Sequence, residues 1–388
     1  MKILHYIDNF LPVIGGGELY IDNIIKNLPG FEFDVLTSDI CSGLKKEKYY
    51  KRSTIYRIPP SNSSEKSSSL VKRSSVFFFN TLKSYLRLKK KKIFLKNNKY
   101  DLIHFHGEGI NIEFRTFDKI IKTPFLSFLP DFNFLPAKKI LTLHSFISYF
   151  TNHPVDLWWE KRLIDMFDNI ICVDLFIYNE VKNIVEKIGA SKNVWFIPNS
   201  VNINKFKFLP LKKSSKLKVL FVGRLSEERG LNLILDFIKN LPDFIDFTFV
   251  GASSIHLPED IKEHHDLSNI VFLGNISNDR LPEFYQNADV VLNFVKVPGI
   301  SRITLEAMAS GRPVVMLDIG DRTPIINKKT GFLIKEDMEE LIALLHHISE
   351  NRISLADMSY QARKVIESEY SNYIILKKIE AIYKSAVL

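Results

Sequence analysis

Short apolar runs alternate with longer amphipathic stretches along most of the chain. Runs rich in β-branched and aromatic residues predict strands, and stretches with an apolar residue every three or four positions predict helices. In the first half the expected strands are Lys2–Ile7, Glu32–Leu36, Leu102–His106, Lys139–His144, Asn169–Val173 and Val194–Ile197, and the expected helices are Glu18–Leu28, Val76–Leu95, Asp156–Phe167 and Phe176–Ile188.

The second half repeats this alternation. The expected strands are Lys218–Val222, Phe247–Val250, Ile270–Leu273, Val290–Phe294 and Val314–Leu317, and the expected helices are Leu231–Lys239, Asp279–Asn287, Arg302–Ser310, Met338–Glu350 and Ile353–Glu369. Alternating strands and helices favour parallel sheets with helices on both faces. Because the pattern occurs twice, we expect an α/β fold of two doubly wound, Rossmann-like domains, with ligand at the carboxyl ends of the strands.

A domain boundary is predicted near 202–215, a segment without clear periodicity. We therefore expect an N-terminal domain over 1–203 and a C-terminal domain over 204–370, followed by a last helix within 371–388. The Ser-rich stretch 60–75 is interpreted as a loop inside the first domain.

The composition fits a chain with more than one hydrophobic core. There are 388 residues, of which 46% are hydrophobic. Two cysteines, Cys41 and Cys172, form neither a metal-binding spacing nor a disulfide framework, which fits a reducing, cytoplasmic location. Residues 1–7 are interpreted as a strand rather than a signal peptide, and no run reaches the roughly 18 apolar residues that span a bilayer.

The net charge of +9 is concentrated in residues 38–100. Within it, residues 72–96 interleave Lys and Arg with aromatic and aliphatic residues. This pattern is typical of a helix that lies on an anionic membrane surface, and equally of a solvated helix that covers a sheet. Nucleic acid is not expected as a partner, because no zinc-finger or aromatic RNA-binding signature is present.

The segment from Ser301 to Val315 joins a polar loop, a helix and a strand. Ser301 is expected to cap the helix, leaving the first-turn amides of Ile303 and Thr304 available to an anion, with Glu306 one turn further on. Such a unit suits a nucleoside diphosphate. The alternative is an ordinary capped helix with an exposed Glu306.

Two cations stand on one predicted strand-to-helix loop. Gly223-Arg224 ends a strand and Arg229-Gly230 precedes the next helix. Both guanidinium groups can face a diphosphate, because their planar forks match phosphate oxygens. Solvated side chains are the alternative. Backbone groups of Leu273 to Asn275, after another strand, are candidates to hold a nucleobase edge.

Glycines and histidines end strands of the first half. Gly15-Gly16-Gly17 allows a ligand to approach the start of a helix, although the third glycine of the dinucleotide fingerprint is replaced by Tyr20. His104, His106 and His144 end two neighbouring strands. A sugar contact by His144, satisfied core histidines and a zinc site are the interpretations left open, and no i,i+4 His pair on a helix supports zinc.

Taken together, these motifs resemble the retaining glycosyltransferases of the GT-B fold, family 4 of that classification. The resemblance covers almost the whole chain and is carried by order and spacing, in Gly15-Gly-Gly-Glu18, Asp101-Leu-Ile-His-Phe-His-Gly107, Leu141-Thr-Leu-His144, Ile197-Pro-Asn-Ser-Val-Asn202, Phe221-Val-Gly-Arg224, Arg229-Gly230, Val271-Phe-Leu-Gly274, Leu305–Val315 and Gly331-Phe-Leu-Ile334.

The resemblance implies a nucleotide-sugar donor held mainly by the second domain. Arg224 and Arg229 would hold the diphosphate, Glu306 the ribose, and His144 would lie near the sugar. The helix in 371–388 would return to the N-terminal domain. The implied catalytic residues are His144, Arg224, Arg229 and Glu306, and the implied donor-binding residues are Gly16, Gly17, Asn199, Gly223, Leu273, Gly274, Arg302, Ile303 and Thr304.

The chain departs from the family pattern at three positions. Pro298 stands where the first of two spaced glutamates is usual, Ser145 where Asp usually follows the strand histidine, and Ser200 where Gly usually follows Asn199. Ser301 and Arg302 are the candidates to replace the missing glutamate. An unusual donor or weak catalysis is the expected consequence.

The resulting hypothesis is a hexosyltransferase-type enzyme of glycan or polysaccharide biosynthesis. It would transfer sugar with retention to a glycan or lipid-linked acceptor, without metal or other cofactor, because the arginines and helix amides would stabilise the leaving diphosphate. A location at the cytoplasmic membrane face is a further hypothesis. The alternatives are a non-catalytic nucleotide-sugar-binding subunit and a nucleotide-sugar epimerase of the same fold.

Overall fold

The chain folds into two compact units, Met1–Ile197 together with Leu376–Leu388, and Pro198–Ile375. The computed structural model describes residues 1–12, 15–38, 45–58, 90–107, 137–144, 161–212, 214–224, 226–251, 268–297 and 299–388. Phe206, from the segment 202–215 expected to link the domains, and Val201, expected in the N-terminal domain, are buried in a core of the second unit. This burial explains why the second unit begins at Pro198, earlier than the expected residue 204.

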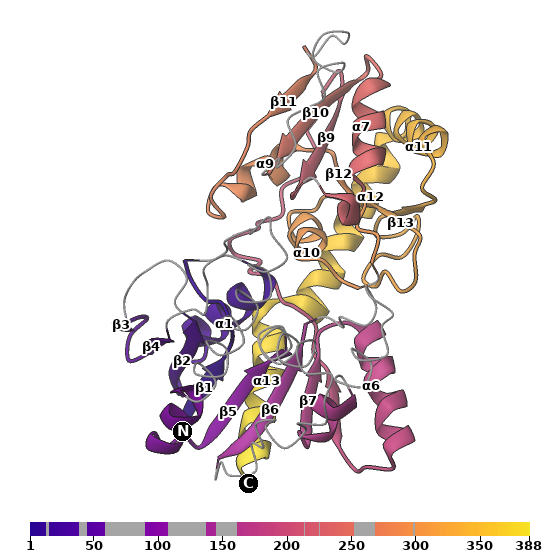
Figure 1. Cartoon of the computed structure of the whole chain (residues 1–388). Helices are drawn as coiled ribbons and strands as arrows, with labels where there is room; N and C mark the ends of the chain where they lie inside the picture. The colour runs from indigo at the N-terminus through magenta and orange to yellow at the C-terminus, as the bar shows by residue number, and fades with distance from the viewer. Residues whose placement is uncertain are drawn as a thin grey trace, which may run out of the picture. The chain divides into compact units, whose positions relative to one another are not determined.

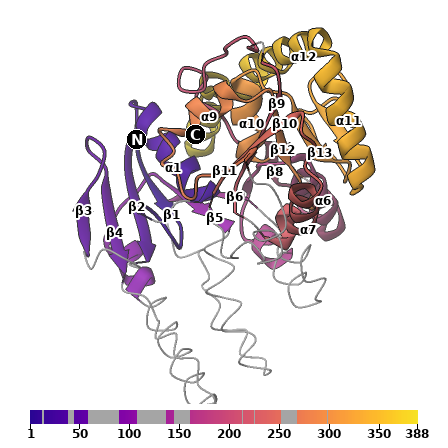
Figure 2. The same ribbon diagram turned by 90° about the horizontal axis from the view of Figure 1, so that it is seen from above.

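The first unit is built on an eight-stranded sheet of order β3-β4-β2-β1-β5-β6-β7-β8, in which β3 is antiparallel to β4 and the other pairs are parallel. The strands at one side of this sheet are seen side by side in Figure 2. Their bounds are β1 Lys2–Tyr6, β2 Glu32–Ser38, β3 Lys46–Lys48, β4 Thr54–Ile58, β5 Leu102–His106, β6 Lys138–Leu143, β7 Asn169–Cys172 and β8 Asn193–Phe196.

Side-chain alternation gives this sheet two different faces. Ile103 and Phe105 of β5 join a hydrophobic cluster with Leu141 and Leu143 of β6. His104 and His106 of β5 point to the other face, where Tyr383 of α13 (Asn372–Val387) packs on His104. Helix α1 (Gly16–Asn27) and helix α6 (Leu175–Ile188) also belong to this unit, and both are labelled with α13 in Figure 1.

Strands β3 and β4 were not predicted. β3 consists of Lys-Glu-Lys and lies at the sheet edge, so it lacks the apolar pattern of a strand. In β4, Arg57 interrupts the apolar run, but it is buried and pairs with Glu47 of β3. Both strands lie in the basic region, where charge masked the strand signal.

The basic stretch 72–96 lies mostly outside the described residues. Its described part belongs to a helix over 90–97 in which Lys90, Lys92 and Lys96 are exposed. Lys91 is buried, with Nζ 3.5 Å from Asp8 Oδ1 and 4.7 Å from the centre of the Tyr6 ring. One cation of this stretch therefore holds the helix to the sheet.

The second unit is a six-stranded parallel sheet of order β11-β10-β9-β12-β13-β14. The strands are β9 Leu217–Val222, β10 Ile245–Val250, β11 Ile270–Phe272, β12 Val290–Asn293, β13 Val314–Leu317 and β14 Phe332–Ile334, and the helices are α7 Leu231–Lys239, α9 Leu281–Asn287, α10 Arg302–Ala309, α11 Met338–Glu350 and α12 Arg352–Val365. A π-helical turn, Ile366–Tyr370, follows α12. β14 was not expected as a strand.

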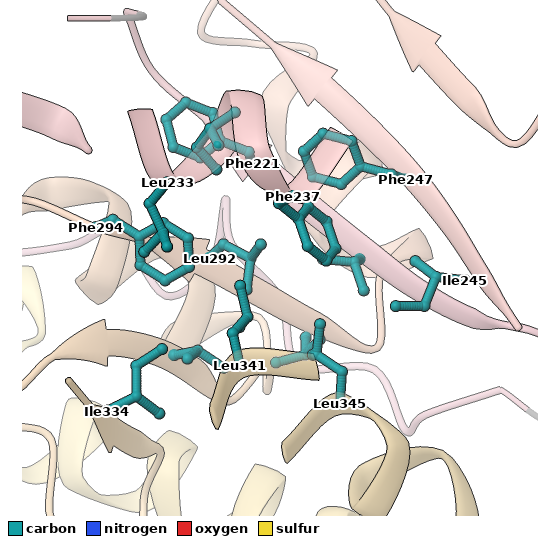
Figure 3. Close-up of a cluster of buried hydrophobic side chains, with 14 of the residues drawn as sticks. Phe221, Leu233, Phe237, Ile245, Phe247, Leu292, Phe294, Ile334, Leu341 and Leu345 are labelled. Carbon is teal, nitrogen blue, oxygen red and sulfur yellow. The ribbon is translucent and has the colours of Figure 1, made fainter. Parts of the chain in front are cut away.

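Helices cover both faces of the second sheet. On one face Phe221, Phe247 and Leu292 pack against side chains of α7 and α11, as Figure 3 shows. On the other face Leu220 and Val291 pack with residues of α9, α10 and α12. Two Rossmann-like units are thus present, as expected. None of the helices in the described parts of the chain is long and apolar enough for a membrane-spanning segment.

Candidate functional site

The strand order of the second unit places a crevice between β9 and β12. The chain runs outward from β9 to β10 and β11, and then crosses to β12 on the other side of β9. Ligands of doubly wound sheets bind at the carboxyl ends of the strands where the order reverses in this way. Gly223-Arg224 follows β9 and the loop to α10 follows β12, so two predicted motifs meet at this point.

Backbones approach closely at the floor of this crevice. Gly223 N donates a hydrogen bond of 2.8 Å to Val250 O, and Gly251 (φ +149°) packs on Gly223. A Cβ on Gly251 would lie 1.9 Å from Gly223 O. No side chain fits at Gly251, so a glycine is required for the ends of β9 and β10 to pack this closely.

Arg224 and Arg229 lie close enough to influence each other. Burial lowers the pKa of Arg229, and the charge of Arg224 lowers it further. A Cβ on Gly223 would lie 3.6 Å from Arg229 Nη1 and 3.5 Å from Ile303 Cδ1. In the described part of the chain neither arginine has an ion pair with a carboxylate, although Glu228 lies near Arg229. Two like charges held together in this way favour an anion.

Helix α10 begins beside these arginines, with Ser301 as its N-cap. Ser301 Oγ accepts the N–H of Thr304 at 3.1 Å. The expectation that the cap leaves the Thr304 amide available is therefore wrong, because this amide is the one that the cap uses. The amides of Arg302 and Ile303 are the remaining first-turn donors, at the positive end of the helix.

Asn293, at the end of β12, fixes this helix start and was not predicted. Its Nδ2 donates to Ser301 Oγ at 2.7 Å and to Thr304 Oγ1 at 2.9 Å. A polar residue at the end of a buried apolar strand is the sequence signal that could have revealed it.

Arg322, which was also not predicted, is buried and donates to the carbonyls of Val295 and Val297, so it holds the loop before α10. Pro298 lies outside the described residues.

Glu306 is buried (5% exposed) rather than a surface residue. Tyr285 OH of α9 donates to Glu306 Oε2 at 3.0 Å, and Arg302 Nε lies 4.0 Å from Glu306 Oε1. Burial raises the pKa of Glu306, and the charge of Arg302 and the hydrogen bond from Tyr285 counteract this rise. A carboxylate held at one oxygen keeps the other available to accept from a ligand hydroxyl.

The loop after β11 offers fewer backbone groups than the sequence suggested. Leu273 N donates to Phe249 O at 2.9 Å, and Gly274 O accepts from Gly251 N at 2.8 Å. Leu273 C=O and Gly274 N–H have no backbone partner in the described part of the chain. One acceptor and one donor therefore remain for a nucleobase edge.

Asn199, the first polar residue after β8, belongs to the second unit. Its Oδ1 is buried and has no hydrogen-bond partner among the described residues. An unpartnered buried amide oxygen is costly and marks a position that a ligand donor would satisfy.

The first unit has its own switch point between β1 and β5. Gly17 lies in the first turn of α1, and a Cβ on it would lie 3.8 Å from His144 Nε2. Gly16 is exposed, with no atom within 4 Å of a Cβ placed on it. Gly17 and His144 are thus neighbours near the carboxyl ends of β1 and β6, whereas Gly16 does not contact His144.

The strand histidines of this unit are tied into hydrogen bonds. His106 lies 3.0 Å from His5 and 3.2 Å from His144, measured between ring nitrogens. His104 bonds Tyr383 OH at 2.7 Å and Thr142 Oγ1 at 2.5 Å. Ring nitrogens of His5, His104 and His106 lie within 4.8 Å of one another, as metal ligands do. Both ring nitrogens of His104 and of His106 are already hydrogen-bonded, so a metal ion ligated by these histidines would displace one hydrogen bond from each of the two.

A cavity of about 480 Å³ in the second unit lies elsewhere. Lys218, Asp246 and Asn269 line it, at the amino-terminal ends of β9 to β11. It contains none of the predicted site residues. Ligand binding to a parallel sheet is expected at the opposite edge.

The arrangement of the second unit can bind a phosphorylated ligand. Arg229 and Ile303 of the first turn of α10 both lie beside Gly223, and the charge of Arg224 acts on Arg229. The buried Glu306 lies one turn further along α10. Residues 216–351, which include these groups, match the family model described as glycosyl transferases group 1.

Curated relatives match most of the chain. An uncharacterized glycosyltransferase of Methanocaldococcus jannaschii, MJ1178, is 24% identical over 361 residues, covering 90% of this chain and 89% of that protein. The alpha-galactosylglucosyldiacylglycerol synthase of Streptococcus pneumoniae is 24% identical over 300 residues, covering 71% and 75%.

Solved structures match the fold over the full length. Sucrose-phosphate synthase from Thermosynechococcus elongatus has a TM-score of 0.72 at 15% identity and covers 99% of this chain and 98% of that one. HepE of Anabaena, solved with UDP-glucose, has a TM-score of 0.64 at 16% identity and covers 99% and 100%. These structures share the GT-B fold with this chain.

Proposed function

We propose that this chain transfers a sugar from a nucleotide-diphosphate sugar with retention of configuration. The premise of this proposal is that the chain is a GT-B glycosyltransferase with a group 1 domain over residues 216–351. The observation that carries the proposal is the placement of the Arg229 guanidinium. It packs over Gly223 and beside Ile303 at the start of α10. Among the described residues no carboxylate forms an ion pair with it, although the charge of Glu228 acts on it.

The leaving nucleoside diphosphate gains negative charge as the sugar–phosphate bond breaks. Arg224, Arg229 and the first-turn amides of α10 would stabilise this charge without reorganisation, usually the largest catalytic effect. This is the chemistry that a divalent metal supplies in other transferases, so the proposal requires no metal. Glu306 would accept hydrogen bonds from the ribose hydroxyls.

Retention follows from attack on the face that the diphosphate leaves. The acceptor hydroxyl oxygen forms a bond to the anomeric carbon while the carbon–oxygen bond to phosphate breaks, and the hydroxyl proton passes to a phosphate oxygen. The intervening state resembles an oxocarbenium ion. His144 is proposed to contact the sugar, and Asn199, with its unpartnered oxygen, to accept from the donor.

The acceptor is proposed to be a glycan or a lipid-linked molecule. The Streptococcus pneumoniae relative is named as a synthase of a glycosyldiacylglycerol. The exposed Lys90, Lys92 and Lys96 suit an anionic membrane surface, worth about 1 kcal/mol each near such a surface. Sedimentation with vesicles that contain anionic lipid, compared with neutral vesicles, tests this part by itself.

The test of the main proposal is incubation with a panel of nucleotide sugars, with and without acceptors. We expect release of a nucleoside diphosphate that increases with acceptor, and a product with the donor's anomeric configuration by NMR. Isomerised sugar without acceptor would establish the epimerase alternative, and binding without turnover on any acceptor the non-catalytic alternative. Binding of no nucleotide sugar would overturn the proposal.

A further inference from the structure

Three histidines from neighbouring strands form a line across the first sheet. His5 lies on β1, His106 ends β5 and His144 follows β6, and these strands are adjacent. His5 Nδ1 is 3.0 Å from His106 Nε2, and His106 Nδ1 is 3.2 Å from His144 Nε2. The ring of Tyr20 packs edge-on against His106 and His144. The line ends at His144, directly after the carboxyl end of β6.

Burial favours the neutral form of all three rings. Burial lowers the pKa of His5 to about 3 and that of His144 to about 4, and it lowers the pKa of His106 well below its usual range. The neighbouring histidines lower the pKa of His106 further, and no carboxylate counteracts this. A neutral imidazole carries one N–H, so it donates at one nitrogen and accepts at the other.

This restriction leaves two directions for the whole line. His106 is bonded at both nitrogens, so it must accept from one neighbour and donate to the other. If His5 Nδ1–H donates, then His106 Nδ1–H donates to His144 Nε2, and His144 carries its proton on Nδ1. In the reverse direction, His144 carries its proton on Nε2 and His5 on Nε2.

The surroundings of His5, at the other end of the line, favour one of these two hydrogen-bond directions. His5 Nε2 is buried and has no hydrogen-bond partner among the described residues. In the reverse direction this atom would be a buried N–H without an acceptor, and such orphaned donors are rarer in proteins than unsatisfied acceptors. The direction that begins with a proton on His5 Nδ1 is therefore favoured.

We propose that the line from His5 through His106 holds His144 as the Nδ1–H tautomer, so that His144 presents a hydrogen-bond donor, and that His106 is its positioning residue. No described residue bonds His144 Nδ1. The identity of the hydrogen-bond acceptor rests on the proposed function: His144 Nδ1–H would donate to an oxygen of the donor sugar or its phosphate. The tautomer itself does not depend on that function.

The experiment measures the tautomer directly. Protein labelled with ¹⁵N-histidine is compared by long-range ¹H–¹⁵N correlation at pH 7.5, with His144 assigned by its loss in His144→Gln. We expect the proton on Nδ1 of His144 in the unsubstituted protein. In His106→Phe the constraint is gone, and the Nε2–H form that free side chains prefer should appear. In His106→Asn the amide N–H replaces the lost donor and should restore Nδ1–H.

His104→Gln is the matched control, because His104 is equally buried on the same strand but bonds Tyr383 and Thr142 instead. It should leave the His144 tautomer unchanged. A proton on Nε2 of His144 in the unsubstituted protein, or an unchanged tautomer in His106→Phe, would overturn the proposal. If His144 carries its proton on Nδ1 but the protein binds no nucleotide sugar, the proposed function is wrong, whereas the assignment of the His144 tautomer remains valid.

In steady-state kinetics we expect His106→Phe to raise the KM for nucleotide sugar about tenfold, as for loss of one hydrogen bond to a ligand. We expect His106→Asn to have a KM close to that of the unsubstituted protein. A purely structural role would instead change stability in both variants without a tautomer change. A KM unchanged in His106→Phe despite an altered tautomer would overturn the assignment of His106 as a positioning residue.

Discussion

At the scale of single residues, the candidate site consists of charged and polar groups that are buried or only partly partnered. Arg229 has no carboxylate in an ion pair within the described residues, and the Asn199 oxygen is buried and unsatisfied. Glu306 is buried against Tyr285 and Arg302. Unpartnered groups such as the Asn199 oxygen lower the stability of the folded protein until a ligand bonds them. We therefore interpret them as ligand-binding groups.

Replacement of Arg224 by Ala should lower the turnover of sugar transfer by roughly 30- to 1,000-fold, or about 2–4 kcal/mol, as for loss of one donor to a developing charge. Steady-state kinetics measures this. Arg280→Ala is the control, because Arg280 is exposed and pairs with Glu283 on α9. Equal rates for the two variants would contradict the role given to Arg224.

Replacement of Tyr285 by Phe should weaken nucleotide binding about 5- to 30-fold, because Glu306 loses the hydroxyl that holds its Oε2. Calorimetry with the nucleoside diphosphate measures it. The matched control is Tyr360→Phe, on the exposed side of α12. If nucleotide affinity is the same in both variants, Glu306 does not act through Tyr285.

At the scale of elements, the ends of strands and helices carry the site. Ser301, Asn293 and Thr304 tie the start of α10 to the end of β12, and the buried Arg322 holds the loop between them. The glycines at the ends of β9 and β10 let these strands approach each other. The elements therefore fix the positions at which the charged side chains act.

Gly251→Ala should separate the ends of β9 and β10, because the new Cβ would lie 1.9 Å from a carbonyl oxygen and φ is +149°. We expect a stability loss of about 1–3 kcal/mol, measured by urea unfolding, together with weaker nucleotide binding. Gly30→Ala serves for comparison, since nothing lies within 4 Å of a Cβ there. A Gly251→Ala protein as stable as Gly30→Ala would disprove this account of the crevice floor.

At the scale of the whole molecule, the buried histidines link stability to pH. An unfolded histidine binds a proton below about pH 6.5, whereas burial lowers the folded pKa of His5 to about 3 and of His144 to about 4. The unfolded state therefore binds more protons in this window, and stability falls as pH falls. Each such histidine contributes a slope of up to about 1.4 kcal/mol per pH unit.

Urea unfolding between pH 7.5 and pH 5 measures this slope. In His104→Gln the slope should be smaller by up to about 1.4 kcal/mol per pH unit, because burial also keeps His104 neutral. Burial raises the pKa of Glu18, which acts in the opposite direction, so the difference between the two proteins isolates the histidine. Equal slopes would show that His104 is protonated or already neutral in both states.

The sequence by itself determined the two Rossmann-like units and most of their elements. Apolar periodicity is a local property, so Leu102–His106, Leu231–Lys239 and Val314–Leu317 were predicted with the bounds that the structure has. The residue types in the loop after β9 and in the helix after β12 also indicated Arg224, Arg229 and Glu306 as site candidates. Strand β3 was missed because an edge strand of charged residues carries no apolar pattern.

Only the tertiary structure decided which groups meet and which remain available. The cap on the Thr304 amide, the Tyr285–Glu306 bond and the buried Lys91 depend on side chains that are distant in sequence or on one specific rotamer. The histidine line joins residues 5, 106 and 144 through strand order and register. Local pattern cannot encode such contacts, because packing of the whole sheet sets the distances over which hydrogen bonds form.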